Sequence, residues 1–129
     1  MTEMDSGRLA ARLAALADSK KGEEIVALDM RDLVSYTDFL VICTARNERQ
    51  AAAIADEVHL RLKKDEGMLP ARVEGVGAAG WVLLDYLDCV LHVFTQEARE
   101  RYQLEELWRE APRLELDLAA SGSQHAASA

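Results

Sequence analysis

The sequence predicts an α/β fold in which a mixed five-stranded sheet is flanked by helices. Two stretches with apolar residues at helical spacing alternate with short apolar runs in the first half of the chain. Three more apolar runs, separated by turn residues, and a last helical stretch follow. A strand–helix–strand unit implies a parallel strand pair with a right-handed crossover, and a hairpin adds an antiparallel edge to the same sheet.

The first half supplies two helices and two strands. Residues 6–20 carry leucines on one helical face. The runs 25–30 and 39–45 are β-branched and almost continuously apolar, which is typical of strands buried on both faces of a sheet. Asn47 is placed to cap the next helix and Gly67 to end it, because these residues favour the two kinds of helix terminus.

The second half supplies three short strands and a last helix. The strands are predicted over residues 72–74, 81–84 and 89–95. A glycine-containing loop precedes the second of them, and a tight hairpin turn joins the second to the third. The last helix begins near Gln96, with a break near Tyr102, and Pro112 interrupts it.

The chain of 129 residues, half of them apolar, fits one domain, which we expect over residues 1–118. Residues 119–129 are too poor in apolar side chains to order themselves and predict a flexible tail. No signal peptide or membrane span is evident, so we expect a cytoplasmic protein. Cys43 and Cys89 lie within apolar runs and are interpreted as reduced core residues, with a structural disulfide between them as the alternative.

Acidic residues outnumber basic ones by 23 to 15, which gives a formal net charge of -8. Such a balance argues against direct binding to nucleic acid and against anchoring on an anionic membrane. An acidic surface favours a basic partner, most commonly a protein, although the charge is equally explained by solubility alone.

Motifs for common catalytic chemistries do not occur: the chain has no Walker loop, no GxGxxG between a strand and a helix, no HExxH and no GxSxG. The glycines at 75, 77 and 80 precede a strand rather than a helix, so a mobile loop is favoured over a phosphate site. The three histidines lack partners at ligand spacing. We therefore expect neither a cofactor nor a metal site.

Carboxylates at strand ends and turns leave one enzymatic alternative open. Asp29, Asp85 and Asp88 lie where active-site residues often collect, and a pair of them could hold Mg²⁺ for phosphoryl transfer. Each equally suits a turn, because a short carboxylate accepts hydrogen bonds from nearby backbone N–H groups. No cluster of Lys or Arg stands beside them to hold phosphates, which favours the turn interpretation.

Trp81 follows Gly80 at the start of a predicted strand, with Leu83 and Asp85 on the same face. A core tryptophan is one interpretation. An exposed tryptophan beside a flexible loop is typical of an interface anchor, and nearby aromatic residues could extend the patch. His92 alternates with apolar residues along the last strand and is interpreted as a hydrogen-bonded core residue.

An ordered set of short segments is similar to the ribosomal silencing factor S family, also called Iojap. The segments are Ala27-Leu28-Asp29, Tyr36 to Ile42, Arg49-Gln50, Ile54-Ala55-Asp56, Glu74-Gly75, Gly80 to Asp85, Val90 to Phe94 and Tyr102 to Trp108. The similarity extends from about Leu9 to Trp108. It implies a nucleotidyltransferase-like sheet without the catalytic motif of that superfamily; a divergent Mg-dependent nucleotidyltransferase is the alternative.

The resemblance also implies a function and partners. Members of the family bind the large ribosomal subunit at its protein number fourteen, block joining of the small subunit and repress translation when nutrients are scarce. They tend to form homodimers when free. For this chain the resemblance therefore implies a non-enzymatic translation repressor that binds no nucleic acid directly.

By position, Trp81 matches the tryptophan of the family's ribosomal-protein interface. Its neighbours Val82, Leu83, Asp85 and Tyr86, together with Tyr102, are the other predicted contacts. Asp38 and His92 match the family pattern too and are assigned to internal hydrogen bonds.

Two positions depart from the family pattern. Ala45 and Leu87 stand where members usually have glycine. If the usual glycine has a positive φ, Leu87 would be strained or the hairpin turn rebuilt.

Overall fold

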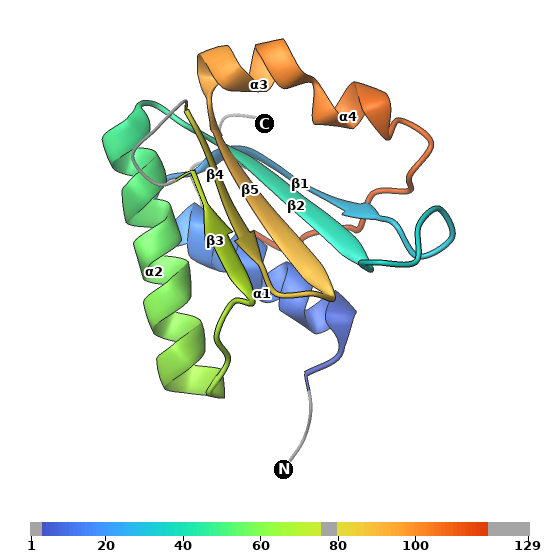
Figure 1. Ribbon diagram of the computed structural model, residues 1–129, viewed down its shortest axis with the longest axis horizontal. Coiled ribbons are helices and arrows are strands. Elements are labelled where there is room, and N and C mark those ends of the chain that lie inside the picture. Colours follow the sequence, from blue (N-terminus) through green and yellow to red (C-terminus); the bar gives the residue numbers. More distant parts are fainter. Residues whose placement is uncertain (1–3, 76–79, 119–129) are drawn as a thin grey trace.

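Five strands form one mixed sheet in the computed structural model, which describes residues 4–75 and 80–118 (Figure 1). The strand order across the sheet is β1-β2-β5-β4-β3. In chain order the elements are α1 (Ser6–Ser19), β1 (Glu23–Asp29), β2 (Phe39–Ala45), α2 (Glu48–Glu66), β3 (Arg72–Glu74), β4 (Trp81–Asp85), β5 (Cys89–Thr95), α3 (Gln96–Tyr102) and α4 (Leu104–Leu107). The predicted fold class is confirmed.

The strands β2 and β5 are parallel neighbours at the centre of the sheet, whereas the pairs β1–β2, β4–β5 and β3–β4 are antiparallel. The parallel partner of β2 is thus the last strand, not the strand that follows α2. Both central strands are seven residues long and almost entirely buried, while β3 has three residues, all exposed. Burial on two faces favours the longest apolar strands at the centre and leaves the short polar strand at an edge.

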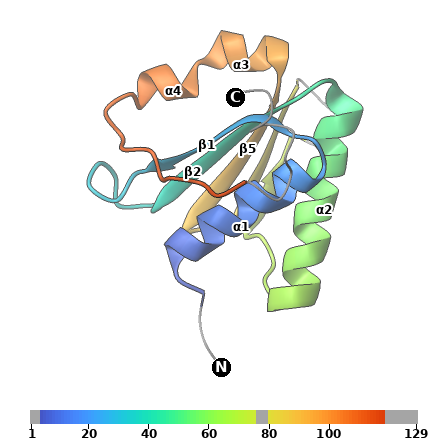
Figure 2. The same cartoon turned by 180° about the vertical axis from the view of Figure 1, so that it is seen from behind.

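The helices α1 and α2 pack side by side on one face of the sheet, as Figure 2 shows from behind. Fully buried side chains from both helices and the sheet form the core there, among them Leu13, Ile54 and Leu91. The predicted caps of α2 are confirmed. The Asn47 side chain accepts a hydrogen bond from the backbone N–H of Gln50, and Gly67 ends the helix with a left-handed backbone.

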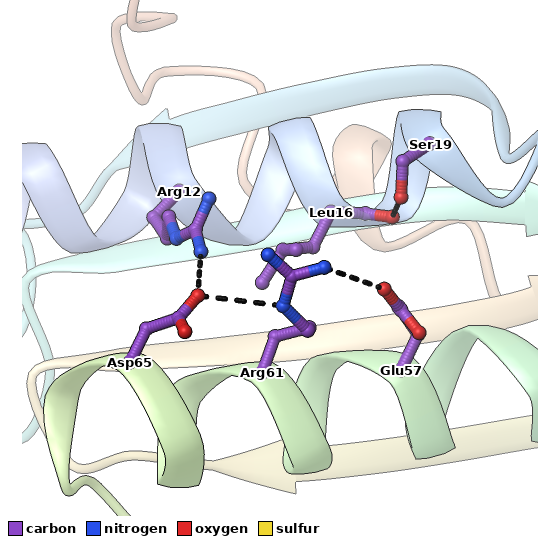
Figure 3. Close-up of polar contacts among 6 residues, drawn as sticks. All are labelled: Arg12, Leu16, Ser19, Glu57, Arg61 and Asp65. Carbon is purple, nitrogen blue, oxygen red and sulfur yellow. Dashed lines mark hydrogen bonds and ion pairs between the residues drawn. The ribbon is translucent and has the colours of Figure 1, made fainter.

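Polar side chains join α1 to α2 above this core (Figure 3). The Arg12 guanidinium of α1 lies 2.6 Å from a carboxylate oxygen of Asp65 on α2. Arg61 lies 3.4 Å from the same oxygen and 3.6 Å from a carboxylate oxygen of Glu57. All four side chains are partly exposed, so water weakens these ion pairs and the buried apolar surface supplies most of the stability of the helix pair.

The helices α3 and α4 cover only part of the opposite face of the sheet (Figure 1). A second apolar cluster beneath them includes Ile42, Phe94 and Ala98. The predicted break in the last helix is confirmed: α3 ends at Tyr102, and Gln103 has a left-handed backbone with φ 47°. This partial cover leaves one side of β4 accessible.

The chain after α4 returns to the free edge of β1. The backbone N–H of Asp29 donates to the carbonyl of Pro112, Leu114 N–H donates to the carbonyl of Ala27, and Arg113 pairs with Leu28. The segment that follows the predicted helix breaker thus shields an edge strand, which otherwise presents unpaired backbone groups to other chains.

One predicted strand differs in detail from the structure, and two predicted features fall on residues that the structure does not describe. The strand expected over 25–30 begins two residues earlier, at Glu23, and contains a β-bulge between Glu23 and Val26. Gly77 of the glycine loop and the predicted flexible tail, residues 119–129, lie outside the described residues.

Candidate protein-interaction surface

The strand β4 directs alternate side chains to the two faces of the sheet, as its sequence predicts. Trp81, Leu83 and Asp85 are partly exposed, whereas Val82 and Leu84 are buried against the helices α1 and α2. Because side chains alternate along a strand, three of the predicted contact residues share one face.

The Trp81 indole ring is half-buried among other aromatic rings. Its centroid lies 4.6 Å from the ring centroid of Tyr102 on α3 and 5.0 Å from that of Phe94 on β5. Tyr102 itself is 40% exposed. The structure therefore brings Trp81 and Tyr102 together, although 20 residues lie between them in the sequence. The Phe94 ring packs against both of these rings.

The indole N–H of Trp81 donates a hydrogen bond to Nδ1 of His92, at a distance of 3.0 Å. His92 lies on β5 opposite Leu83 and is 7% exposed. Burial lowers the pKa of His92 to about 4, and the nearby Asp85 carboxylate opposes this shift only partly. The prediction of a hydrogen-bonded core histidine is confirmed.

Apolar and charged groups adjoin Trp81 toward the edge of the sheet. A hollow of about 240 Å³ is lined by Glu74, Gly75, Trp81 and Leu83. Beside it the Arg72 guanidinium lies 3.3 Å from a carboxylate oxygen of Glu74 and 3.5 Å from one of Asp85. We call Trp81, Leu83 and Tyr102, with Glu74 and Asp85 at their rim, the Trp81 surface.

Two glycines shape the entry into β4. Gly75 and Gly80 both have a positive φ, at 83° and 72°. A Cβ at Gly75 would overlap the carbonyl oxygen of Trp81, and one at Gly80 would lie 2.6 Å from Oγ1 of Thr95. Both positions therefore require glycine, because they combine a left-handed backbone with a close approach of neighbouring atoms.

A buried cation fixes α3 and α4 to the sheet. Arg99, which is 9% exposed, donates hydrogen bonds of 2.9 and 2.7 Å to the two carboxylate oxygens of Glu105, and one of 2.8 Å to Oγ1 of Thr44 on β2. The hydrogen bonds from Arg99 hold the pKa of the Glu105 carboxyl below its usual range. Tyr102 lies between the two ion-pair partners in sequence, so the pair fixes the segment that carries this ring.

Sequence reasoning missed this cluster. Arg99 and Glu105 are six residues apart, a spacing that does not pair side chains on a continuous helix. They meet because the chain turns at Gln103. The helix break predicted near Tyr102 was therefore the feature of the sequence that could have indicated this contact.

Two members of the predicted contact set do not reach this surface. Val82 is 3% exposed and Tyr86 is 7% exposed, and both side chains pack in the core beneath α1 and α2. Burial raises the pKa of Tyr86 to about 12, and its hydroxyl has no hydrogen-bond partner among the described residues. Val82 faces the core because it alternates with Trp81 and Leu83, and both Val82 and Tyr86 lie outside the Trp81 surface.

Two of the three carboxylates of the enzymatic alternative, those of Asp29 and Asp85, make structural contacts. Asp29 accepts hydrogen bonds of 2.9 and 2.7 Å from the Arg31 guanidinium, and Asp85 accepts one of 2.8 Å from the backbone N–H of Leu87. Asp29 lies on β1, three strand spacings or about 14 Å from β4, which is too far for these two residues to share one metal ion. Within residues 4–75 and 80–118, no group of three His, Cys, Asp or Glu side chains could hold a metal ion.

Three further predictions concern Asp38, Ala45 and Leu87. Asp38 makes its hydrogen bonds through the backbone, with the carbonyl accepting from Met30 and the N–H donating to the carbonyl of Asp88.

Ala45 is buried and has no left-handed backbone, so it replaces the usual glycine without strain. Leu87 has φ 73° and is 62% exposed, which confirms the strain expected of a leucine at this hairpin position.

The two cysteines are buried and free, as predicted. In the part of the chain that the structure describes, no helix combines the length and apolarity needed to cross a bilayer.

Comparison with known proteins agrees with this architecture. A solved structure from Chromobacterium violaceum has a TM-score of 0.76 and 30% sequence identity, and the match covers 93% of this chain and 100% of that one. A crystal structure from Bacillus halodurans has a TM-score of 0.69 and 40% identity, covering 81% of this chain and 95% of the other.

Several curated bacterial relatives are named as ribosomal silencing factors. The ribosomal silencing factor RsfS of Halalkalibacterium halodurans is 42% identical over 100 residues, which is 78% of this chain and 85% of the relative. The chloroplastic protein Iojap of Arabidopsis thaliana is 32% identical, over 88% of this chain and 47% of the relative. The family model for RsfS, the ribosomal silencing factor during starvation, matches residues 3–129. Because this model covers most of the chain and the relative from Halalkalibacterium halodurans is 42% identical, the chain belongs to the RsfS family of ribosomal silencing factors.

Proposed function

We propose that the chain binds the large ribosomal subunit through protein number fourteen of that subunit and sterically blocks joining of the small subunit. Translation would thereby be repressed in stationary phase or under nutrient limitation. The observation that carries the proposal is the half-buried Trp81, which lies beside Tyr102 and lines an apolar hollow with Leu83 and Glu74.

The chemistry of the Trp81 surface suits a basic protein. The Trp81 ring, Leu83 and Tyr102 offer apolar contact area of the kind that dominates binding energy at interfaces. Glu74 and Asp85 at the rim offer carboxylates to basic side chains of a partner. Arg72 lies within 3.5 Å of both carboxylates, but it is 60% exposed, so these ion pairs are weak.

The net charge of -8 restricts where the chain can sit on a ribosome. Ribosomal RNA repels an acidic surface, so docking on a ribosomal protein is favoured over direct contact with nucleic acid. The same charge accelerates the encounter with a basic partner at low ionic strength.

We further infer that the free protein is a homodimer, as the family resemblance implies. Light scattering at micromolar concentration tests this inference, with a dimer mass of twice 14.3 kDa as the expected result. A monomer mass at that concentration would contradict it.

Co-sedimentation with purified large subunits tests the main proposal. The substitution Trp81→Glu places a charge in the centre of the surface, and we expect at least about a tenfold loss of the pelleted fraction. A thermal melt shows whether the variant is folded. Because the ring also packs on Phe94, the milder Tyr102→Ala serves as a second variant, with a smaller loss expected.

The matched control is Leu60→Glu, which adds the same charge at a 56% exposed apolar residue of α2. This variant should pellet as the unmodified protein does. A Trp81→Glu protein that is folded and pellets normally would contradict the proposed surface. Unmodified protein that does not pellet with large subunits would contradict the function itself.

A further inference from the structure

A hydrogen bond joins the Trp81 ring on β4 to His92 on the neighbouring strand β5. The indole N–H lies 3.0 Å from Nδ1 of His92, and the two ring centroids are 5.8 Å apart with a 36° angle between the planes. The strands β4 and β5 pair so that Leu83 stands opposite His92 and Trp81 opposite Phe94. The indole therefore reaches diagonally across the strand pair to its acceptor.

The indole also packs against two aromatic rings. Phe94 and Tyr102 lie within 5.0 Å of its centroid, and both present ring surfaces. Contacts between ring surfaces depend less strongly on angle than a hydrogen bond does. The hydrogen bond to His92 forms only when the ring edge that carries the N–H faces the imidazole, so it favours one orientation of the indole.

The imidazole can serve as this acceptor only with Nδ1 unprotonated. Burial of His92 holds the ring neutral, since its pKa is lowered to about 4. The acceptor is thus available throughout the neutral pH range. The acceptor is itself rigid, because His92 lies in the middle of β5 and is 7% exposed.

We propose that His92 is a positioning residue: by accepting the indole N–H it holds Trp81 in a single orientation on the Trp81 surface before a partner arrives. An anchor that is already ordered loses little rotamer entropy on binding, so part of the affinity comes from a residue that the partner does not touch. The consequence for affinity rests on the proposed function, whereas the positioning itself is a property of the free protein.

The positioning is tested on the free protein by NMR, in a Trp108→Phe background that leaves Trp81 as the only tryptophan. His92→Phe keeps a ring of similar size but removes the acceptor. His92→Asn places an amide oxygen close to the position of Nδ1. We expect the indole N–H resonance to shift and its order parameter to fall in His92→Phe, and both to return toward the original values in His92→Asn.

The consequence for binding is tested by a double-mutant cycle with large subunits. We expect His92→Phe to weaken binding about fivefold, as for loss of one hydrogen bond, and His92→Asn to restore most of it. In a Trp81→Phe background, which has no indole N–H, His92→Phe should cause no further loss.

Two results would overturn the proposal. One is an unchanged indole resonance and order parameter in His92→Phe. The other is that His92→Phe weakens binding equally in the unmodified protein and in the Trp81→Phe background. His92 would then affect binding without its hydrogen bond to the indole. If the unmodified protein does not bind large subunits, the proposed function fails, while the NMR result still decides whether His92 orients Trp81.

Discussion

Arg99 and Glu105 form an ion pair across the break between α3 and α4, with guanidinium–carboxylate hydrogen bonds of 2.9 and 2.7 Å. The Arg99 side chain is 9% exposed and also reaches Thr44 on the central strand β2. A buried cation with three hydrogen bonds is sensitive to removal of a partner, because water replaces the lost hydrogen bonds poorly at the buried Arg99 and Thr44. This pair therefore controls how firmly the segment bearing Tyr102 is attached to the sheet.

Removal of Arg99 should destabilise the fold. We expect Arg99→Met to lower the free energy of unfolding by about 3 kcal/mol, since it leaves the Glu105 carboxylate and the Thr44 hydroxyl without their donor. Urea denaturation at pH 7 measures the change. The control is Arg12→Met, which breaks a partly exposed ion pair and should cost less than about 1 kcal/mol. Equal losses in the two variants would contradict the structural role assigned to Arg99.

Relief of backbone strain at Leu87 should stabilise the protein. With φ 73° and a side chain that is 62% exposed, Leu87 has a left-handed backbone and few contacts to lose. We expect Leu87→Gly to raise the free energy of unfolding by about 1 kcal/mol. Leu87→Ala keeps the Cβ and therefore the strain, so it should give no gain. A stabilisation by alanine as large as that by glycine would show that strain is not the cause.

Stability should fall in mild acid because of His92. Burial lowers its pKa to about 4 in the folded state, against the ordinary value of 6.5 in the unfolded chain. Below pH 6.5 the unfolded state binds a proton that the folded state excludes, so stability is complete above that pH and decreases as the pH falls toward 4. From pH 7.5 to pH 5.0 the loss from this group is about 2 kcal/mol.

Urea denaturation at several pH values measures this dependence, with His92→Asn as the control that cannot titrate. The difference in unfolding free energy between the two proteins should change with pH only below about 6.5. Parallel pH profiles would mean that the folded protein accommodates a charged His92.

The two cysteine thiols should be unreactive in the native protein. Both are fully buried, and burial raises the pKa of Cys43 and of Cys89 to about 12, so neither forms the nucleophilic thiolate at neutral pH. A thiol reagent such as Ellman's reagent should modify both cysteines rapidly in urea and neither within an hour in buffer. Tyr36→Cys, at a 69% exposed position, supplies a reactive thiol as the control. Rapid reaction of the native unmodified chain would contradict this burial.

Much of the fold could be predicted because local patterns and burial agree. The continuously apolar run 39–45 became the fully buried β2, and Asn47 and Gly67 ended α2 as their residue types predict. The candidate surface was predictable in part. Alternation placed Trp81, Leu83 and Asp85 on one face, but the same alternation directs Val82 into the core, and Tyr86 turns inward at the hairpin.

The amino-acid sequence by itself determined the kinds and order of the elements, the acidic character and the family, because periodicity, composition and ordered motifs are properties of neighbouring residues. Only the tertiary structure decided that β5 lies beside β2, that Arg99 meets Glu105 and Thr44, and that Trp81 donates to His92. These relationships join residues from different elements. The strand order follows from burying the most apolar strands at the centre of the sheet, and the Arg99 contacts follow from the position of the helix break. Both features depend on the packing of the whole chain.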